Sequence, residues 1–439
     1  MSNPNHQNPA YVRTEMLGEM EPPVSQTGTI RWVRENLFSS PLNIFLTLVS
    51  IYLVYWILAH ILPWSLGGIW DASSLSECRE IRDALYGEGV RSVACWAVLT
   101  DRWDQLLFGF YPSEYYWRPV LAFTLFGLGL APILSEGVSR KLFYLTVAAP
   151  FLCVWLLWGG SIWSPLSIAF GFVVGWAIYK FSGPHVGLLT ATIGAFVVPI
   201  LYWLFVASSL AGGLATILPI QIEAVPSDQF GGFMLALIIG ISGIVLSLPL
   251  GVLLALGRQS DLFLINKVSV IFIEVIRGVP LIVWLFTASL LLNYFLPPGT
   301  NFDLIVRVII MVTLFSSAYI AEVVRGGLAA LPRGQYEGAN SLGLDYWQSM
   351  QLIILPQAMK ISIPGIVSSF IGLFKDTTLV VFIGLLDPVG LAGAIRATTD
   401  WNGIYWELFI FIGLCFWVFC FAMSRYSQWL ERKLQTDHS

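Results

Sequence analysis

The sequence carries about ten long apolar segments separated by shorter polar connections, and this series constrains the fold more than any other feature. Backbone polar groups inside a bilayer must be satisfied within their own segment, so an apolar stretch of about 20 residues crosses the membrane as an α-helix. Of the 439 residues, 56% are hydrophobic and 11% are charged, as expected when most of the surface faces lipid. The sequence therefore predicts an all-α integral membrane protein, a polytopic helical bundle with spans at 41–64, 118–134, 142–162, 165–180, 187–209, 232–257, 267–296, 303–325, 361–386 and 405–430.

Lysine and arginine residues fall on alternate connections between these segments. Such residues mark the cytoplasmic side of a membrane protein, whatever its net charge, which is −4 here. They precede the first segment, recur in every second connection and follow the last segment: Arg31, Arg34, Arg140, Lys141, Lys180, Arg258, Lys267, Arg325, Arg333, Arg432 and Lys433. We therefore expect both termini in the cytoplasm, with a cytoplasmic tail at 1–38 and an acid-rich outer loop at 65–117.

The sequence lacks the motifs of the common soluble enzyme classes. No Gly-Lys dipeptide occurs, so the chain has no GxxxxGK loop with which to bind ATP. No HExxH motif occurs, and the four histidines are scattered without metal-ligand spacing, so no metal site is expected. No basic stripe with interleaved aromatic residues occurs either, so we expect no binding of nucleic acid.

Two of the five cysteines, Cys78 and Cys95, lie in the outer loop. In an oxidising compartment they could form one disulfide bond, which would stabilise the loop by about 3 kcal/mol. Two free thiols remain the alternative, because sequence alone does not fix the geometry of a bridge. The other cysteines lie in apolar segments, where Cys behaves as a small hydrophobic residue.

The polar stretch between the eighth and ninth segments has the pattern of two short helices around a turn. Pro332 favours a helix start, and Gly343 suits the left-handed residue that follows a helix. Asp345 and Gln348 have the spacing of an N-cap and its N3 residue. We expect Pro356 to break the second helix before the chain re-enters the membrane.

Apolar side chains gather near the corner of these two helices: Tyr336, Leu342, Leu344, Tyr346 and Trp347. Exposed aromatic residues on a polar surface are typical of a site for a protein partner. An amphipathic turn resting on lipid headgroups would have the same composition. The residues by themselves favour neither interpretation.

This stretch resembles the EAA signature of ABC-type importer permeases, in which E-A-A is followed after three residues by G and, nine residues later, by I-x-L-P. The matching positions are Glu337, Gly338, Ala339, Gly343, Ile353, Leu355 and Pro356, with Gly338 as the one departure from Ala. Other motifs resemble the polar amino-acid branch of that family and follow in order: Ile276–Leu281, Ala321-Glu322, Arg325–Gly327, Pro332–Gln335 and Lys375–Leu379.

The resemblance implies a type I ABC importer permease core at 226–434, with a cytoplasmic coupling segment at 328–358. The additional transmembrane helices at 39–225, with a periplasmic loop at 65–117, resemble the enlarged subunit of general L-amino-acid permease pairs. The implied protein lies in the bacterial inner membrane and forms the amino-acid path with a second related permease. A dimer of separate ATPase subunits would bind ATP and Mg, and a periplasmic binding protein would deliver the substrate. This chain would then be no enzyme and would hold no cofactor.

Ionisable groups at membrane depth are candidates for the path, since each costs about 3 kcal/mol or more when it faces lipid. The candidates are the ionisable Glu274, Arg277, Lys375 and Asp376, together with the hydroxyl residues Thr377 and Thr378 that follow. Such groups could bind the carboxylate and ammonium of an amino acid. We favour a purely structural role for Glu274 and Arg277, paired with each other one helical turn apart, and leave both roles open for Lys375 and Asp376.

Glu322 and Arg325 lie near the membrane edge, where we expect them to anchor the coupling segment rather than touch substrate. A secondary transporter or channel for small polar solutes is the main alternative function. That class would need no ATPase and is typically built from inverted repeats, which the sequence does not show.

Overall fold

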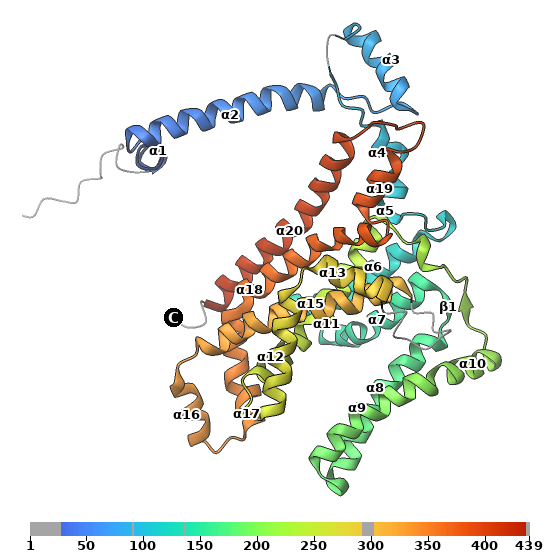
Figure 1. Ribbon diagram of the computed structural model, residues 1–439, viewed down its shortest axis with the longest axis vertical. Coiled ribbons are helices and arrows are strands. Elements are labelled where there is room, and N and C mark those ends of the chain that lie inside the picture. Colours follow the sequence, from blue (N-terminus) through green and yellow to red (C-terminus); the bar gives the residue numbers. More distant parts are fainter. Residues whose placement is uncertain (1–27, 90–91, 136, 292–302, 436–439) are drawn as a thin grey trace, which may run out of the picture. The chain divides into compact units, whose positions relative to one another are not determined.

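The computed structural model describes residues 28–89, 92–135, 137–291 and 303–435. Figure 1 shows that these residues are almost entirely helical; the sheet among them pairs β1 (Gly160–Ser161) antiparallel with β2 (Gln221–Ile222). Eight of the described helices are long and apolar enough to cross a membrane, or up to ten when two bent pairs each count as one span. The predicted all-α membrane bundle of about ten spans is confirmed.

The chain divides into two compact units, and the smaller one holds α1 (Gly28–Leu37), α2 (Pro41–Leu66) and the end of α3 (Leu75–Tyr86). Helix α2 begins at Pro41 because the hydroxyl of Ser40 accepts a hydrogen bond from the amide of Asn43. None of its residues is buried. Its end is held by backbone bonds, from the amide of Ala94 to the oxygen of Trp64 and from the amide of Ile69 to the oxygen of Ala94.

The larger unit begins with short helices and continues with the upstream spans. Two of these spans, α8 and α9, pack closely through glycines. Gly171 faces Trp203, and Gly175 faces Ala195 and Pro199. The elements are α4 (Ala97–Asp101), α5 (Trp103–Phe108), η2 (Ser113–Tyr115), α6 (Trp117–Leu134), η3 (Arg140–Leu142), α7 (Phe143–Trp158), α8 (Trp163–Val186), α9 (Leu188–Phe205), α10 (Ala207–Ile217) and η4 (Ser227–Gln229).

The downstream part of the same unit packs around α11, α15 and α18. These helices approach closely because Gly251 faces Ile320, and Gly327 faces Ala358 and Ser362. The elements are α11 (Gly232–Arg258), α12 (Phe263–Gly278), α13 (Leu281–Phe286), η5 (Thr287–Leu291), α15 (Leu304–Ala329), α16 (Arg333–Ser341), α17 (Tyr346–Ser349), η6 (Met350–Ile354), α18 (Leu355–Asp376), η7 (Thr377–Ile383), α19 (Pro388–Ile395) and α20 (Trp406–Gln435).

Two expected spans are bent rather than straight. The span expected at 187–209 continues into α10 with a bend of 55°, and the span expected at 267–296 bends by 102° between α12 and α13. The second bend falls at Val279 and Pro280, where proline has no amide to continue the helix. Residues 292–296 of that expected span lie outside the described residues.

The prediction that Pro356 breaks the helix before the membrane is wrong. The helical path runs without a break from Tyr346 to Ile383, over 38 residues. Pro356 lies in the first turn of α18, directly after the π-helical turn η6. A π-helical turn shifts the hydrogen-bond pattern, so the missing amide of proline leaves no gap there.

A short helix after η7 was not anticipated. Helix α19 starts at Pro388 because the buried Asp387 carboxylate accepts hydrogen bonds from the amides of Gly390 and Val389, at 2.9 and 3.2 Å. Burial raises the pKa of Asp387 to about 6, although these backbone hydrogen bonds act in the opposite direction. The Asp-Pro pair is an N-cap signal that the hydropathy pattern alone does not show.

The start of α11 packs against α5 so closely that it requires glycine. Gly232 has a φ of +60°, and a Cβ there would lie 2.2 Å from the oxygen of Leu106. We expect Gly232→Ala to cost about 2 kcal/mol or more, from the left-handed backbone and the overlap together. The measurement is the thermal midpoint of the purified protein in detergent, which should fall for Gly232→Ala. Gly213→Ala is the control, because nothing lies within 4 Å of its Cβ; equal midpoints for both variants would contradict the expected overlap.

Candidate functional site

The polar stretch after α15 forms the turn that the sequence predicts. Gly343 follows α16 with a φ of +72°, and its amide donates to the oxygen of Asn340 at 2.9 Å. The amide of Gln348 donates to the Asp345 carboxylate at 2.8 Å, and the Gln348 side chain accepts from the Asp345 amide at 3.1 Å. These bonds form a capping box that fixes the start of α17. The turn geometry is confirmed.

The apolar residues at this corner divide into an exposed group and an anchoring group. Leu342, Tyr346 and Trp347 are exposed, with 75% of Leu342 and 57% of Trp347 accessible. Tyr336 and Leu344 are half-buried, and Tyr336 packs against the hydrophobic cluster at this end of the core. Burial raises the pKa of the Tyr336 phenol. The corner thus exposes three large apolar side chains, and Tyr336 anchors it to the hydrophobic core.

The residues of the EAA-like motif have different environments. Glu337 and Gly338 are exposed on α16, whereas Ala339 is fully buried beneath them. Downstream, Ile353 and Leu355 are half-buried and Pro356 is exposed. A hydrogen bond of 3.0 Å between the side chains of Gln335 and Gln357 ties α16 to α18. The motif therefore joins the exposed corner to the helix that enters the core.

A cluster of ion pairs, here called the Glu322 cluster, joins α11, α12 and α15. The Glu322 carboxylate accepts hydrogen bonds from Arg258 at 2.7 Å and Arg325 at 3.0 Å, and Arg277 lies 3.7 Å from it. Arg258 also binds Glu274 at 2.9 Å. The predicted pairing of Glu274 with Arg277 is therefore wrong: α12 packs against α11 and α15, which bring other partners closer. The structural role that we favoured for both residues fits this cluster.

A cavity of about 220 Å³ lies between α15 and α18, and Asp376 lines it. Of the six predicted path residues, Asp376 is the one that lines this cavity. Lys375 is exposed on the neighbouring face of α18. Thr377 and Thr378 turn their hydroxyls back to the oxygens of Phe374 and Lys375, at 2.8 and 2.9 Å. Both hydroxyls therefore bond to the backbone of their own helical path.

The sequence analysis did not identify the other polar residues that line this cavity with Asp376. Ser316 and Tyr319 come from α15, and Ser369 comes from α18. The signal was present as the run Ser316-Ser317-Ala318-Tyr319 inside an apolar span. In such a site the carboxylate can accept hydrogen bonds from an ammonium group, and a hydroxyl group can donate one to a carbonyl or carboxylate.

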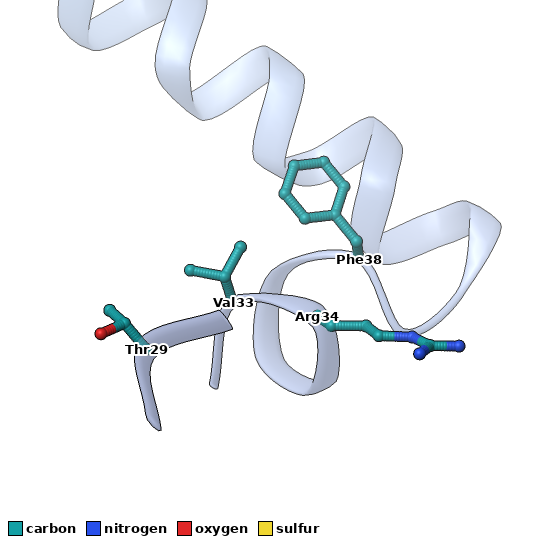
Figure 2. Close-up of a pocket in the computed structure, with 4 residues that line it drawn as sticks. All are labelled: Thr29, Val33, Arg34 and Phe38. Carbon is teal, nitrogen blue, oxygen red and sulfur yellow. The ribbon is translucent and has the colours of Figure 1, made fainter. Parts of the chain in front are cut away.

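A hollow of about 520 Å³ on the smaller unit lacks this convergence of polar groups. Figure 2 shows its lining, formed by Thr29, Val33 and Arg34 of α1 and by Phe38 beyond it. The Arg34 guanidinium is turned away from Phe38 and Val33. We therefore assign no substrate to this hollow.

The described residues contain no group of three or more His, Cys, Asp and Glu side chains that could hold a metal ion. Cys153, Cys415 and Cys420 are free.

Comparison with known proteins gives consistent matches. Residues 247–436 match the family model of the binding-protein-dependent transport system inner membrane component. The glutamate/glutamine/aspartate/asparagine transport system permease protein BztC of Rhodobacter capsulatus is 56% identical over 98% of this chain and 99% of its own length. The inner membrane amino-acid ABC transporter permease protein YhdY of Escherichia coli is 38% identical over 93% of this chain and 94% of its own. A solved amino acid ABC transporter with histidines is 31% identical over 45% of this chain and 90% of that chain, with a TM-score of 0.41.

The two full-length relatives cover the upstream helices as well as the core. In this family ATP is hydrolysed by a separate subunit, the permease holds no cofactor, and a binding protein serves the importer. The chain therefore belongs to the amino-acid ABC transporter permeases, the multi-pass inner-membrane subunits of binding-protein-dependent importers.

Proposed function

We propose that this chain pairs with a second, related permease and forms the path for acidic L-amino acids and their amides. BztC, at 56% identity over nearly the whole chain, is named for glutamate, glutamine, aspartate and asparagine. The observation that carries the proposal is the cavity between α15 and α18, which Asp376 lines together with Ser316, Tyr319 and Ser369. Within a span, a carboxylate in a polar cavity is typical of a substrate path.

The chemistry of the cavity favours the part that these four amino acids share. Asp376 would accept hydrogen bonds from the α-ammonium group, which every substrate carries. A second carboxylate would be repelled by Asp376, so the glutamate and aspartate side chains would point away from it. Lys375, exposed on the adjacent face of α18, would supply an opposite charge to these side chains. Recognition through the shared ammonium would allow a broad range of side chains.

The unbroken helical path from Tyr346 to Ile383 provides the proposed link between ATPase and substrate. Its first residues, Tyr346 and Trp347, belong to the exposed corner, and Asp376 lies near its other end. In this proposal the corner, with the EAA-like motif behind it, fits a groove on an ATPase dimer. Closure of the dimer would then move one helix that carries a path residue.

We also propose that both termini lie in the cytoplasm, with the tail at 1–38, the additional helices at 39–225 and the permease core at 226–434. The basic residues on alternate connections support this orientation. It places the coupling segment, 328–358, on the same side as the ATPase subunits that it would contact.

Uptake of labelled glutamate, glutamine, aspartate and asparagine into cells that lack the gene tests this function. Expression of the chain should restore uptake, and Asp376→Asn should lower it by roughly tenfold or more, because the neutral amide loses a charge-assisted bond to the ammonium. The exposed Asp71 provides the matched control, and Asp71→Asn should behave as wild type. Unchanged uptake in Asp376→Asn, at equal protein levels, would remove this cavity from the path.

We further propose that Cys78 and Cys95 form one bridge in the outer loop. Labelling of intact cells with a membrane-impermeant maleimide should leave both unmodified until a reductant is added. Cys78→Ser should then expose one reactive thiol at Cys95 without reductant. Two reactive thiols in the untreated wild-type protein would refute the bridge.

A further inference from the structure

A larger cavity, of about 630 Å³, lies between the upstream helices and the core. Helices α6, α7 and α8 form one wall, with Phe123, Trp155 and Ser164 among its residues. Helices α11 and α15 form the other, with Val245 and Val306. We call this cavity the α7–α11 groove. Its volume lies in the range of sites that hold one small organic ligand or one hydrocarbon chain.

The open side of the groove faces the interior of the bilayer. All five helices that line it are membrane spans. Val245 and Leu246 line the groove and remain 46% and 47% exposed, and Val306 remains 37% exposed. The lining is mostly apolar, and Ser242 is the polar side chain along its length, so the groove offers water few partners. A hydrocarbon chain entering sideways from the membrane fits these walls.

The charged end of the groove lies at the start of α15 and α8 and at the end of α7. Asp303 precedes α15, Trp158 ends α7 and Ser164 is in the first turn of α8. This is the end of α15 opposite to the one that leads into α16. Beyond Ser164, the groove continues along α11 from Ile238 to Leu246. These two residues are about two helical turns apart, or about 12 Å. One polar end and an apolar shaft match the division of a phospholipid into headgroup and acyl chain.

The polar end carries negative charge. The Asp303 carboxylate accepts hydrogen bonds from the amide of Ile305 at 2.8 Å and from the indole of Trp158 at 3.3 Å. Two arginines donate to backbone oxygens instead: Arg118 to that of Glu223 at 2.6 Å, and Arg307 to those of Ala288 and Ser289. A carboxylate at this position attracts an ammonium headgroup and disfavours a headgroup with net negative charge.

We propose that the α7–α11 groove binds one acyl chain of a zwitterionic phospholipid whose headgroup ammonium lies at Asp303. The bound chain fills the space between the upstream helices and the core, which pack directly through the cluster of Leu156, Leu157 and Ile305. The lipid thereby joins the two parts of the larger unit. This site is separate from the cavity at Asp376, so it does not depend on the substrate proposed above.

The test uses the transporter complex purified through this chain and reconstituted in vesicles of equal phosphatidylethanolamine and phosphatidylglycerol. Either lipid is supplied with a photoactivatable group in its acyl chain, and crosslinked peptides are mapped by mass spectrometry. We expect crosslinks on α7 and α11, with phosphatidylethanolamine favoured roughly fivefold over phosphatidylglycerol, the effect of one charge near the headgroups. Absence of groove crosslinks above those on other exposed surfaces would overturn the proposal, as would a preference for phosphatidylglycerol.

Two variants and one control separate the acyl site from the headgroup site. Val245→Trp places an indole in the groove and should lower its crosslinking roughly fivefold or more. Leu253→Trp makes the same change on the same helix at a residue that is 56% exposed outside the groove, and should have no effect. Asp303→Asn keeps an N-cap acceptor and should retain the crosslinks while abolishing the headgroup preference. Equal crosslinking in Val245→Trp and Leu253→Trp would refute the site.

Discussion

Replacing Gly343 by Val should abolish most amino-acid uptake while the protein still inserts into the membrane. Gly343 has a φ of +72°, and no atom lies within 4 Å of a Cβ built there, so the backbone conformation is the sole obstacle. A β-branched residue in this region costs about 2 kcal/mol, and the turn would relax toward negative φ. That change would alter the directions of the Leu342 and Trp347 side chains, which lie on either side of the turn. We expect uptake to fall roughly tenfold or more.

The same defect should be visible in the reconstituted complex. ATP hydrolysis in proteoliposomes should lose its stimulation by the binding protein in Gly343→Val and keep its basal rate, because the ATPase itself is unchanged. Gly338→Ala is the matched control: Gly338 is exposed on α16 with open space around it and no positive φ, and Ala is the usual residue of the family motif there. Normal uptake in Gly343→Val would show that the corner tolerates a different turn, and coupling would have to be sought elsewhere.

Local signals explain why this turn could be predicted from the sequence. The positive φ at Gly343 and the capping box of Asp345 and Gln348 depend on residues within one or two turns of each other. The spans were predictable for a related reason, because each must satisfy its own backbone in lipid. The misplaced break at Pro356 shows the limit of local rules. A proline ends a helix unless the preceding turn compensates, and the π-helical turn before it leaves no signal in composition.

The partners of charged groups and the lining of cavities could not be predicted in this way. Glu274 and Arg277 are one turn apart on α12, yet each bonds to a residue on another helix. The polar cavity at Asp376 likewise depends on how α15 packs against α18, since Ser316 and Tyr319 come from a helix far away in sequence. Such contacts follow from helix packing, which the periodicity of one segment does not specify.

Glu322→Gln should destabilise the junction of α11, α12 and α15. Glu322 is 16% exposed and is within 4 Å of Arg258, Arg277 and Arg325, which come from three helices. Removing its charge leaves three guanidinium groups with the Glu274 carboxylate alone. Breaking a fully buried pair costs about 3–5 kcal/mol. We expect about 2 kcal/mol here, because Arg325 is 42% exposed and water screens part of the repulsion.

The measurements for Glu322→Gln are the thermal midpoint in detergent and the rate of uptake, and both should fall. Glu274→Gln is the matched control on the same cluster. Glu274 is 56% exposed and bonds to Arg258 alone, so its loss should cost about 0.5 kcal/mol and leave uptake near normal. If the two variants lose the same stability, the guanidinium groups find other counter-charges, and the Glu322 cluster does not hold α11, α12 and α15 together. If Glu322→Gln alone lowers both quantities, the cluster fixes these helices where the coupling segment joins the core.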